Sequence, residues 1–90
     1  MKNILITTQH RGVFLARAND NADLTARSLT DLSDVIMVIN WRNEKGVQGI
    51  AADGPANCKL SAITDAVVIH DVTAVFSVTD QAASKIWKNI

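Results

Sequence analysis

The stretch Val35-Ile36-Met37-Val38-Ile39, which runs directly into Asn40, Trp41 and Arg42, decides how this sequence folds. A strand with one solvent-exposed face alternates apolar and polar residues, whereas a continuous apolar run is typical of a strand buried on both faces. A chain of 90 residues rarely covers both faces of such a strand by itself. The sequence therefore predicts that a second copy covers one face, with Val35, Ile36, Met37, Val38 and Ile39 at a subunit interface.

Composition predicts a single β-rich domain over residues 1–90. Apolar residues make up 48% of the chain, and nine Val and nine Ile favour sheet over helix. Lys plus Arg and Asp plus Glu are nine each, so the net charge is zero and there is no broad electrostatic surface for nucleic acid or membrane. Nucleic acid is therefore a less favoured partner, and no membrane association is expected.

The cysteine content and the N-terminus predict a cytoplasmic protein. Cys58 is the only cysteine, so no intramolecular disulfide can form, and a lone thiol fits a reducing compartment. The apolar stretch at residues 4–6 is too short for the core of a signal peptide, and no apolar run approaches the ~18 residues of a membrane span.

Alternation and turn residues predict a chain made mostly of strands. Gly12 supplies a bend or bulge between the first two strands, and the segment 23–32 fits either a short helix or a short strand. The buried strand is expected to turn back through residues 43–46 into a partner strand. The expected strands are residues 3–8, 13–18, 35–41, 47–52, 58–63, 66–69 and 72–78, with a loop from residue 19, a turn at Ser33 and Asp34 and a bend at His70 and Asp71.

The last segment has a helical period, because Ala83, Ile86, Trp87 and Ile90 form one apolar stripe. Thr79 or Asp80 caps a helix over about residues 80–89, and Trp87 is expected to dock this helix on the sheet. The predicted fold is mainly β within the α+β class: a small, strongly bent antiparallel sheet or partial barrel with one C-terminal helix.

Three short motifs appear in order along most of the chain. They are Thr7 to Phe14 (TTQHRGVF), Gly46 to Pro55 (GVQGIAADGP) and His70 to Val75 (HDVTAV). Together they resemble a family of small uncharacterised phage and prophage proteins. The resemblance implies a mobile-element origin, a place in the host-cell cytoplasm and a compact β-rich fold, and it implies no activity that transfers residue by residue.

Polar and aromatic residues gather at two predicted bends. His10 and Arg11 lie at one, and Trp41, Arg42 and Lys45 lie at the end of the buried strand. A guanidinium group recognises phosphate or carboxylate, and an indole offers a face for stacking. If the bends meet, these five residues form an anion pocket beside a stacking platform. In the alternative interpretation Trp41 is a core or interface anchor and the cations are solvated turn residues.

Catalytic and metal chemistry find weak support in the sequence. A nucleophilic set drawn from Cys58, His70 and Asp71 has no characteristic spacing, and His10, His70 and Cys58 lack the paired spacing of a zinc site. We therefore expect no catalytic residues, no metal and no cofactor.

These observations predict a non-enzymatic, homo-oligomeric binding protein of phage type that sequesters a small anionic, nucleotide-like ligand at subunit interfaces to counter the host. One alternative is a small barrel that binds single-stranded nucleic acid, which predicts an affinity that falls steeply with salt. Another is a virion or host-interaction accessory protein that binds a host protein and no small ligand.

Overall fold

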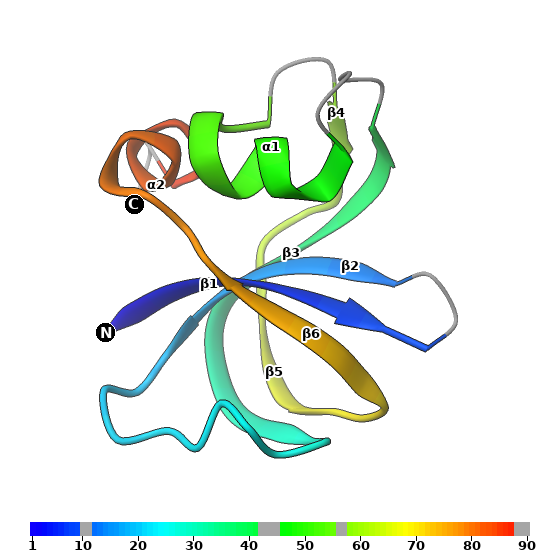
Figure 1. Ribbon diagram of the computed structural model, residues 1–90, viewed down its shortest axis with the longest axis vertical. Helices are drawn as coiled ribbons and strands as arrows, with labels where there is room; N and C mark the ends of the chain where they lie inside the picture. The colour runs from blue at the N-terminus through cyan, green and yellow to red at the C-terminus, as the bar shows by residue number, and fades with distance from the viewer. Residues whose placement is uncertain (10–11, 42–45, 56–57, 88–90) are drawn as a thin grey trace.

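The computed structural model describes residues 1–9, 12–41, 46–55 and 58–87, and of Trp41 it describes the backbone (Figure 1). Within these ranges the chain forms six strands and two short helices. In chain order they are β1 (Lys2–Thr8), β2 (Val13–Ala18), β3 (Leu29–Trp41), α1 (Gly46–Asp53), β4 (Cys58–Leu60), β5 (Thr64–Ile69), β6 (Val72–Ser77) and α2 (Asp80–Ile86).

The strands form one antiparallel sheet in the order β4-β3-β2-β1-β6, and β5 also pairs with β3. β4 and β5 follow each other along one edge of β3, because Trp41 lies opposite Cys58 and Leu29 lies opposite Ile69. β5 pairs with β3 near one edge of the sheet, and β6 forms the other edge beside β1. Only two residues connect β5 and β6, and they span about 11 Å at most. The sheet must therefore curl toward closure, and it remains an open, barrel-like sheet, as Figure 1 shows.

The long strand β3 bends at Asp34. Its register against both β2 and β5 shifts by one residue around this position, which is the signature of a β-bulge. Asp31 and Asp34 both adopt positive φ, 55° and 52°, a conformation that aspartate tolerates better than most residues. The turn predicted at Ser33 and Asp34 is therefore a bulge inside a continuous strand.

Each face of the sheet has its own apolar cluster. The first cluster lies between the sheet and the two helices and includes Ile36 and Val38 of β3 with Ile50 of α1 and Trp87 after α2. The second lies on the opposite face of the sheet and includes Val35. Figure 1 shows both helices on one side of the curled sheet. The chain itself thus covers both faces of β3 at these three positions, so a second copy is not required there.

The strand predicted for residues 47–52 as the hairpin partner of the buried strand is wrong, because Gly46–Asp53 is helix α1, and the connection predicted over 43–46 lies, apart from Gly46, outside the described residues. Val47, Ile50 and Ala51 lie three and four residues apart and contact the first apolar cluster, so the stretch has a helical period as well as a β-like composition. Gly49 weakens the helix interior by about 1 kcal/mol relative to alanine, whereas Gly46 is the first residue and has a φ of 69°, which favours glycine. Packing against α2 and the sheet therefore decides the conformation of this segment.

The remaining predictions are confirmed in part. β1, β2, β5 and β6 lie within a residue or two of the expected strands, and Asp71 turns the chain with a φ of 59°. In the segment 23–32 the chain is a loop to residue 28 and strand from Leu29, and the strand expected over 58–63 ends at Leu60. Thr79 is the N-cap of α2, with its hydroxyl accepting from the Ala82 amide.

Glycine at position 12 allows the backbone to lie close to the Thr8 side chain, and it is not needed there for a positive φ. A Cβ atom there would lie 2.4 Å from the Thr8 hydroxyl oxygen, which accepts a hydrogen bond from the Gly12 amide. A side chain at this position would therefore displace the Thr8 hydroxyl and break its hydrogen bond with the amide of residue 12.

Candidate functional site

Most of the predicted ligand-binding residues lie outside the described part of the chain. His10, Arg11, Arg42 and Lys45 fall in the ranges that are not described, and for Trp41 only the backbone is described, paired with Cys58. Their role as an anion-binding set stays a prediction.

The described residues that flank these segments lie at one end of the β2–β3 ladder. β2 begins at Val13, just after residues 10–11, and β3 ends at Trp41, just before residues 42–45. The two strands are antiparallel, with Phe14 opposite Met37, so the start of β2 and the end of β3 point the same way along the sheet. Sheet topology thus places Val13 and Trp41, the described residues next to the two predicted bends, toward the same end of the ladder.

The predicted interface residues divide between two environments. Val35, Ile36 and Val38 are at most 7% exposed, whereas Met37 is 42% and Ile39 51% exposed. Met37 and Ile39 point to the same face of β3, and Phe14 shares that face because it lies directly opposite Met37. We call Phe14, Met37 and Ile39 the apolar strip. Met37 and Ile39 are the part of the predicted interface that remains open to a partner, and Phe14 beside them is partly buried against the second cluster.

Further exposed apolar side chains follow along the segment that pairs with β3. Ile63, between β4 and β5, is 44% exposed, and Val67 and Val68 of β5 are 82% and 38% exposed. Ser61 ties this segment to the apolar strip, because its amide donates to the Met37 carbonyl oxygen and its hydroxyl accepts from the Met37 amide, both at 2.9 Å. Ser61 thus holds the segment that contains Ile63 beside β3 at Met37, whereas Val67 and Val68 lie farther along, beside the first half of β3.

The fold separates Cys58, His70 and Asp71. Cys58 pairs with Trp41 at one end of β3, whereas His70 follows Ile69, which pairs with Leu29 at the other end of this 13-residue strand. The His70 ring nitrogen Nδ1 lies 2.9 Å from the Ser28 hydroxyl oxygen, so it ties the β5–β6 turn to the start of β3. The three residues do not form one constellation.

A polar cluster that sequence reasoning missed fastens α2 to the sheet. The Trp87 indole Nε1 donates to the Asp34 carbonyl oxygen at 2.9 Å, and the Arg17 guanidinium lies 5.0 Å from the centre of the Trp87 ring. Arg17 also pairs with the Asp34 carboxylate at 3.6 Å. The bulge at Asp34 turns its carbonyl group away from the strand ladder, which explains why periodicity alone gives no signal of this contact.

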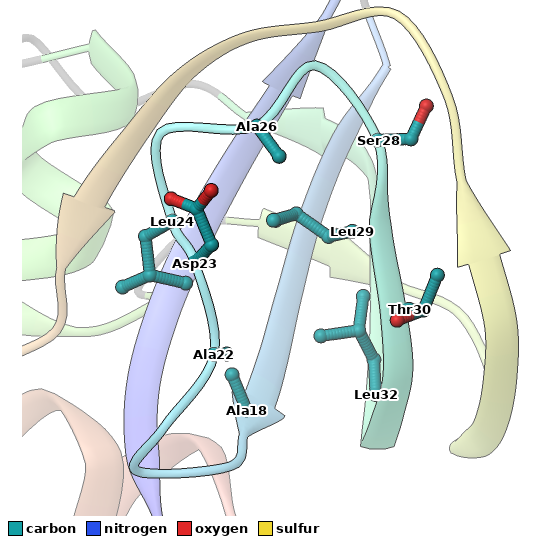
Figure 2. A pocket seen from close by; sticks show the side chains of 9 residues that line it. All are labelled: Ala18, Ala22, Asp23, Leu24, Ala26, Ser28, Leu29, Thr30 and Leu32. Carbon is teal, nitrogen blue, oxygen red and sulfur yellow. The ribbon is translucent and has the colours of Figure 1, made fainter.

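A second feature without a sequence signal is a pocket beneath the loop 19–28 (Figure 2). It has a volume of about 220 Å³ and lies between this loop and the first half of β3. Ala18, Leu29 and Leu32 form its buried wall, and Ala22 and Ala26 line it from the loop. Asp23 is the one ionisable residue among those that line it.

Neither a metal centre nor a membrane span is found in the described residues. No group of three or more His, Cys, Asp or Glu side chains there is arranged to hold a metal ion. In the same part of the chain, neither helix has the length and apolarity needed to cross a bilayer.

These features define a small, open, strongly curled antiparallel sheet with two helices on one face and the apolar strip across β2 and β3. The chain matches the family model described as a domain of unknown function (DUF6948) over residues 1–86, and it therefore belongs to this family. Comparison with curated proteins and with solved structures gives no significant match.

Proposed function

We propose that this chain is a non-enzymatic binding protein of phage or prophage origin, which assembles through the apolar strip and sequesters a small anionic, nucleotide-like ligand beside that interface. The observation that carries the proposal is the position of the strip. Met37 and Ile39 are about half exposed on β3, and this strand runs on into the segment that contains Arg42 and Lys45.

Burial of the apolar strip would supply the driving force for assembly. Removing apolar surface from water contributes roughly 25 cal/mol per Å², and a stable interface buries ~800 Å² on each partner. Three side chains cannot provide this area alone, so Ile63, which follows β4 and is 44% exposed, would extend the contact together with surrounding polar residues. Two copies that meet here would bring the ends of two β3 strands, and with them two sets of basic residues, toward one interface.

The assembly is tested by light scattering on Met37→Asp and on Val67→Asp as its matched control. Both substitutions place a carboxylate on an exposed apolar position of the same sheet, but Val67 lies on β5, at the other half of β3. The proposal expects a defined oligomer for the parent and for Val67→Asp, and a smaller species for Met37→Asp. A monomeric parent, or an oligomer that survives Met37→Asp, would contradict it.

Ligand binding is tested by thermal shift with a panel of linear and cyclic nucleotides. A ligand at a hundred times its Kd stabilises the folded state by ~2.7 kcal/mol, which raises Tm by about 10 to 20 °C in a domain of this size. Arg42→Ala should abolish the shift, whereas Arg27→Ala, an exposed arginine at the opposite end of the sheet, should leave it unchanged. The absence of stabilisation by any nucleotide would refute this part of the proposal.

A further inference from the structure

We propose that the pocket beneath the loop 19–28 is a second binding site, which takes a small molecule with an apolar body and a cationic amine head. The pocket lies at the end of β2 and the start of β3, and so at the opposite end of this ladder from Val13 and the backbone of Trp41, the described residues next to the predicted nucleotide-binding set. It is therefore independent of the proposed nucleotide site.

The wall of the pocket recognises an apolar body. Ala18, Leu29 and Leu32 are 0%, 3% and 2% exposed. In Figure 2 the two leucines point from β3 toward the loop, whereas the hydroxyl-bearing side chains of Ser28 and Thr30 point the other way. Protein interiors rarely leave voids larger than a water molecule. Here the hollow persists because the loop presents alanine side chains, Ala22 and Ala26, where larger ones would fill it.

The volume limits the size of the ligand. An apolar cavity of ~150 Å³ holds a benzene molecule. The pocket, at about 220 Å³, has room for a ring of that size with one or two additional heavy atoms, and not for a nucleotide. The ligand class is therefore a small aromatic or cyclic aliphatic molecule with a short polar extension.

Asp23 sets the charge of that extension. Its Oδ1 atom accepts hydrogen bonds from the Thr25 amide and the Thr25 hydroxyl. Among the described residues, no hydrogen bond or ion pair engages Oδ2, and Figure 2 shows the Asp23 side chain on the side of the loop that faces β3. The bonds from Thr25 also lower the pKa of Asp23, so the carboxylate stays charged in neutral solution and favours a cation.

The test uses benzylamine as the probe and benzoate, which has the same ring and the opposite charge, as its control. Binding is followed by NMR through the methyl signals of Leu29 and Leu32. The proposal expects saturable shifts with benzylamine and much weaker ones with benzoate. Absence of these shifts with benzylamine, or equal affinity for the two probes, would overturn it.

Three variants assign the binding to the pocket. Ala26→Leu fills the hollow from the loop and should abolish the shifts, with Ala22→Leu as a second filling variant if the first does not fold. Asp23→Asn keeps the acceptor for Thr25 and should weaken benzylamine about two- to fivefold, the range of an exposed charge pair. Asp20→Asn changes an aspartate of the same loop that does not line the pocket, and it should bind like the parent. Binding unaffected by the filling variants would refute the assignment.

Discussion

Replacing Trp87 with Phe should destabilise the protein by about 2 to 3 kcal/mol. The substitution removes the indole donor to the Asp34 carbonyl oxygen, a hydrogen bond with a net worth of ~0.5 to 1.5 kcal/mol. It also weakens the contact between the ring and the Arg17 guanidinium, worth ~0.5 to 1 kcal/mol at a partly exposed site. Because Trp87 is only 3% exposed, the lost ring atoms add about 1 kcal/mol of apolar burial.

The loss is measured by urea denaturation followed by circular dichroism. The urea concentration at the midpoint of unfolding should fall, while the slope of the unfolding free energy against urea concentration stays constant. A change in stability without a change in the surface exposed on unfolding alters only the midpoint. A loss below about 0.5 kcal/mol, the size of an ordinary surface substitution, would refute the conclusion that Trp87 anchors α2 to the sheet.

A double-mutant cycle with Arg17→Met separates the ring contact from the hydrogen bond. Methionine keeps much of the apolar length of arginine but carries no charge. If the guanidinium interacts with the indole, the loss of stability caused by Trp87→Phe should be smaller in the Arg17→Met background than in the parent. The difference between the two losses should be about 0.5 kcal/mol or more. Strict additivity would show that burial and the hydrogen bond alone hold Trp87 in place.

Two further predictions concern a helix cap and a titration. Thr79→Val should cost about 1.5 to 3 kcal/mol, because the Thr79 hydroxyl accepts from the Ala82 amide and donates to the Ala52 carbonyl oxygen, while Thr79→Ser, which keeps both bonds, should stay within about 0.5 kcal/mol of the parent in the same urea assay. The Asp23 carboxyl should titrate below its ordinary pKa, because it accepts from the Thr25 hydroxyl and amide. The pKa of Asp23 is lower in the folded state than in the unfolded state. The stability that its bonds with Thr25 contribute is therefore present above the unfolded-state pKa and is lost as pH falls through the folded-state pKa. Carboxyl NMR should show the Asp23 midpoint rising in Thr25→Ala, and an unchanged midpoint would refute the cause.

Much of the sheet is predictable from local pattern. β1, β2, β5 and β6 each have a mainly apolar stretch bounded by turn residues, and the helix stripe through Ile86 and Trp87 follows from its period. The resemblance to small uncharacterised proteins is confirmed to the extent that the chain belongs to an uncharacterised family, DUF6948, over residues 1–86, and the quoted motifs stay a prediction. Its phage or prophage part stays a prediction.

Local pattern fails where a segment fits two periods. Val47, Gly49 and Ala51 alternate as a strand would, while Val47, Ile50 and Ala51 form a helical stripe, and contact with α2 selects the helix. The hydrogen bond from the Thr79 amide to the Ala51 carbonyl oxygen joins residues far apart in sequence. No window of sequence around α1 contains this information.

The candidate sites show the same division. The basic and aromatic residues at the two predicted bends are visible in the sequence, but only the antiparallel register of β2 and β3 shows that Val13 and Trp41, the described residues next to these bends, lie toward one end of the sheet. The pocket beneath the loop 19–28 gives no sequence signal, because its residues belong to a loop and to two strands, and its volume depends on how these pack together.

The apolar run at Val35–Ile39 by itself determines that β3 is a strand with two apolar faces, because β-branched side chains alternate between the faces of a sheet. Which of these side chains are covered was decided by the tertiary structure. The two helices cover Ile36 and Val38, the second apolar cluster contains Val35, and Met37 and Ile39 remain exposed. The physical reason is that burial depends on contacts between segments distant in sequence, whereas strand formation follows from the residues of the strand itself.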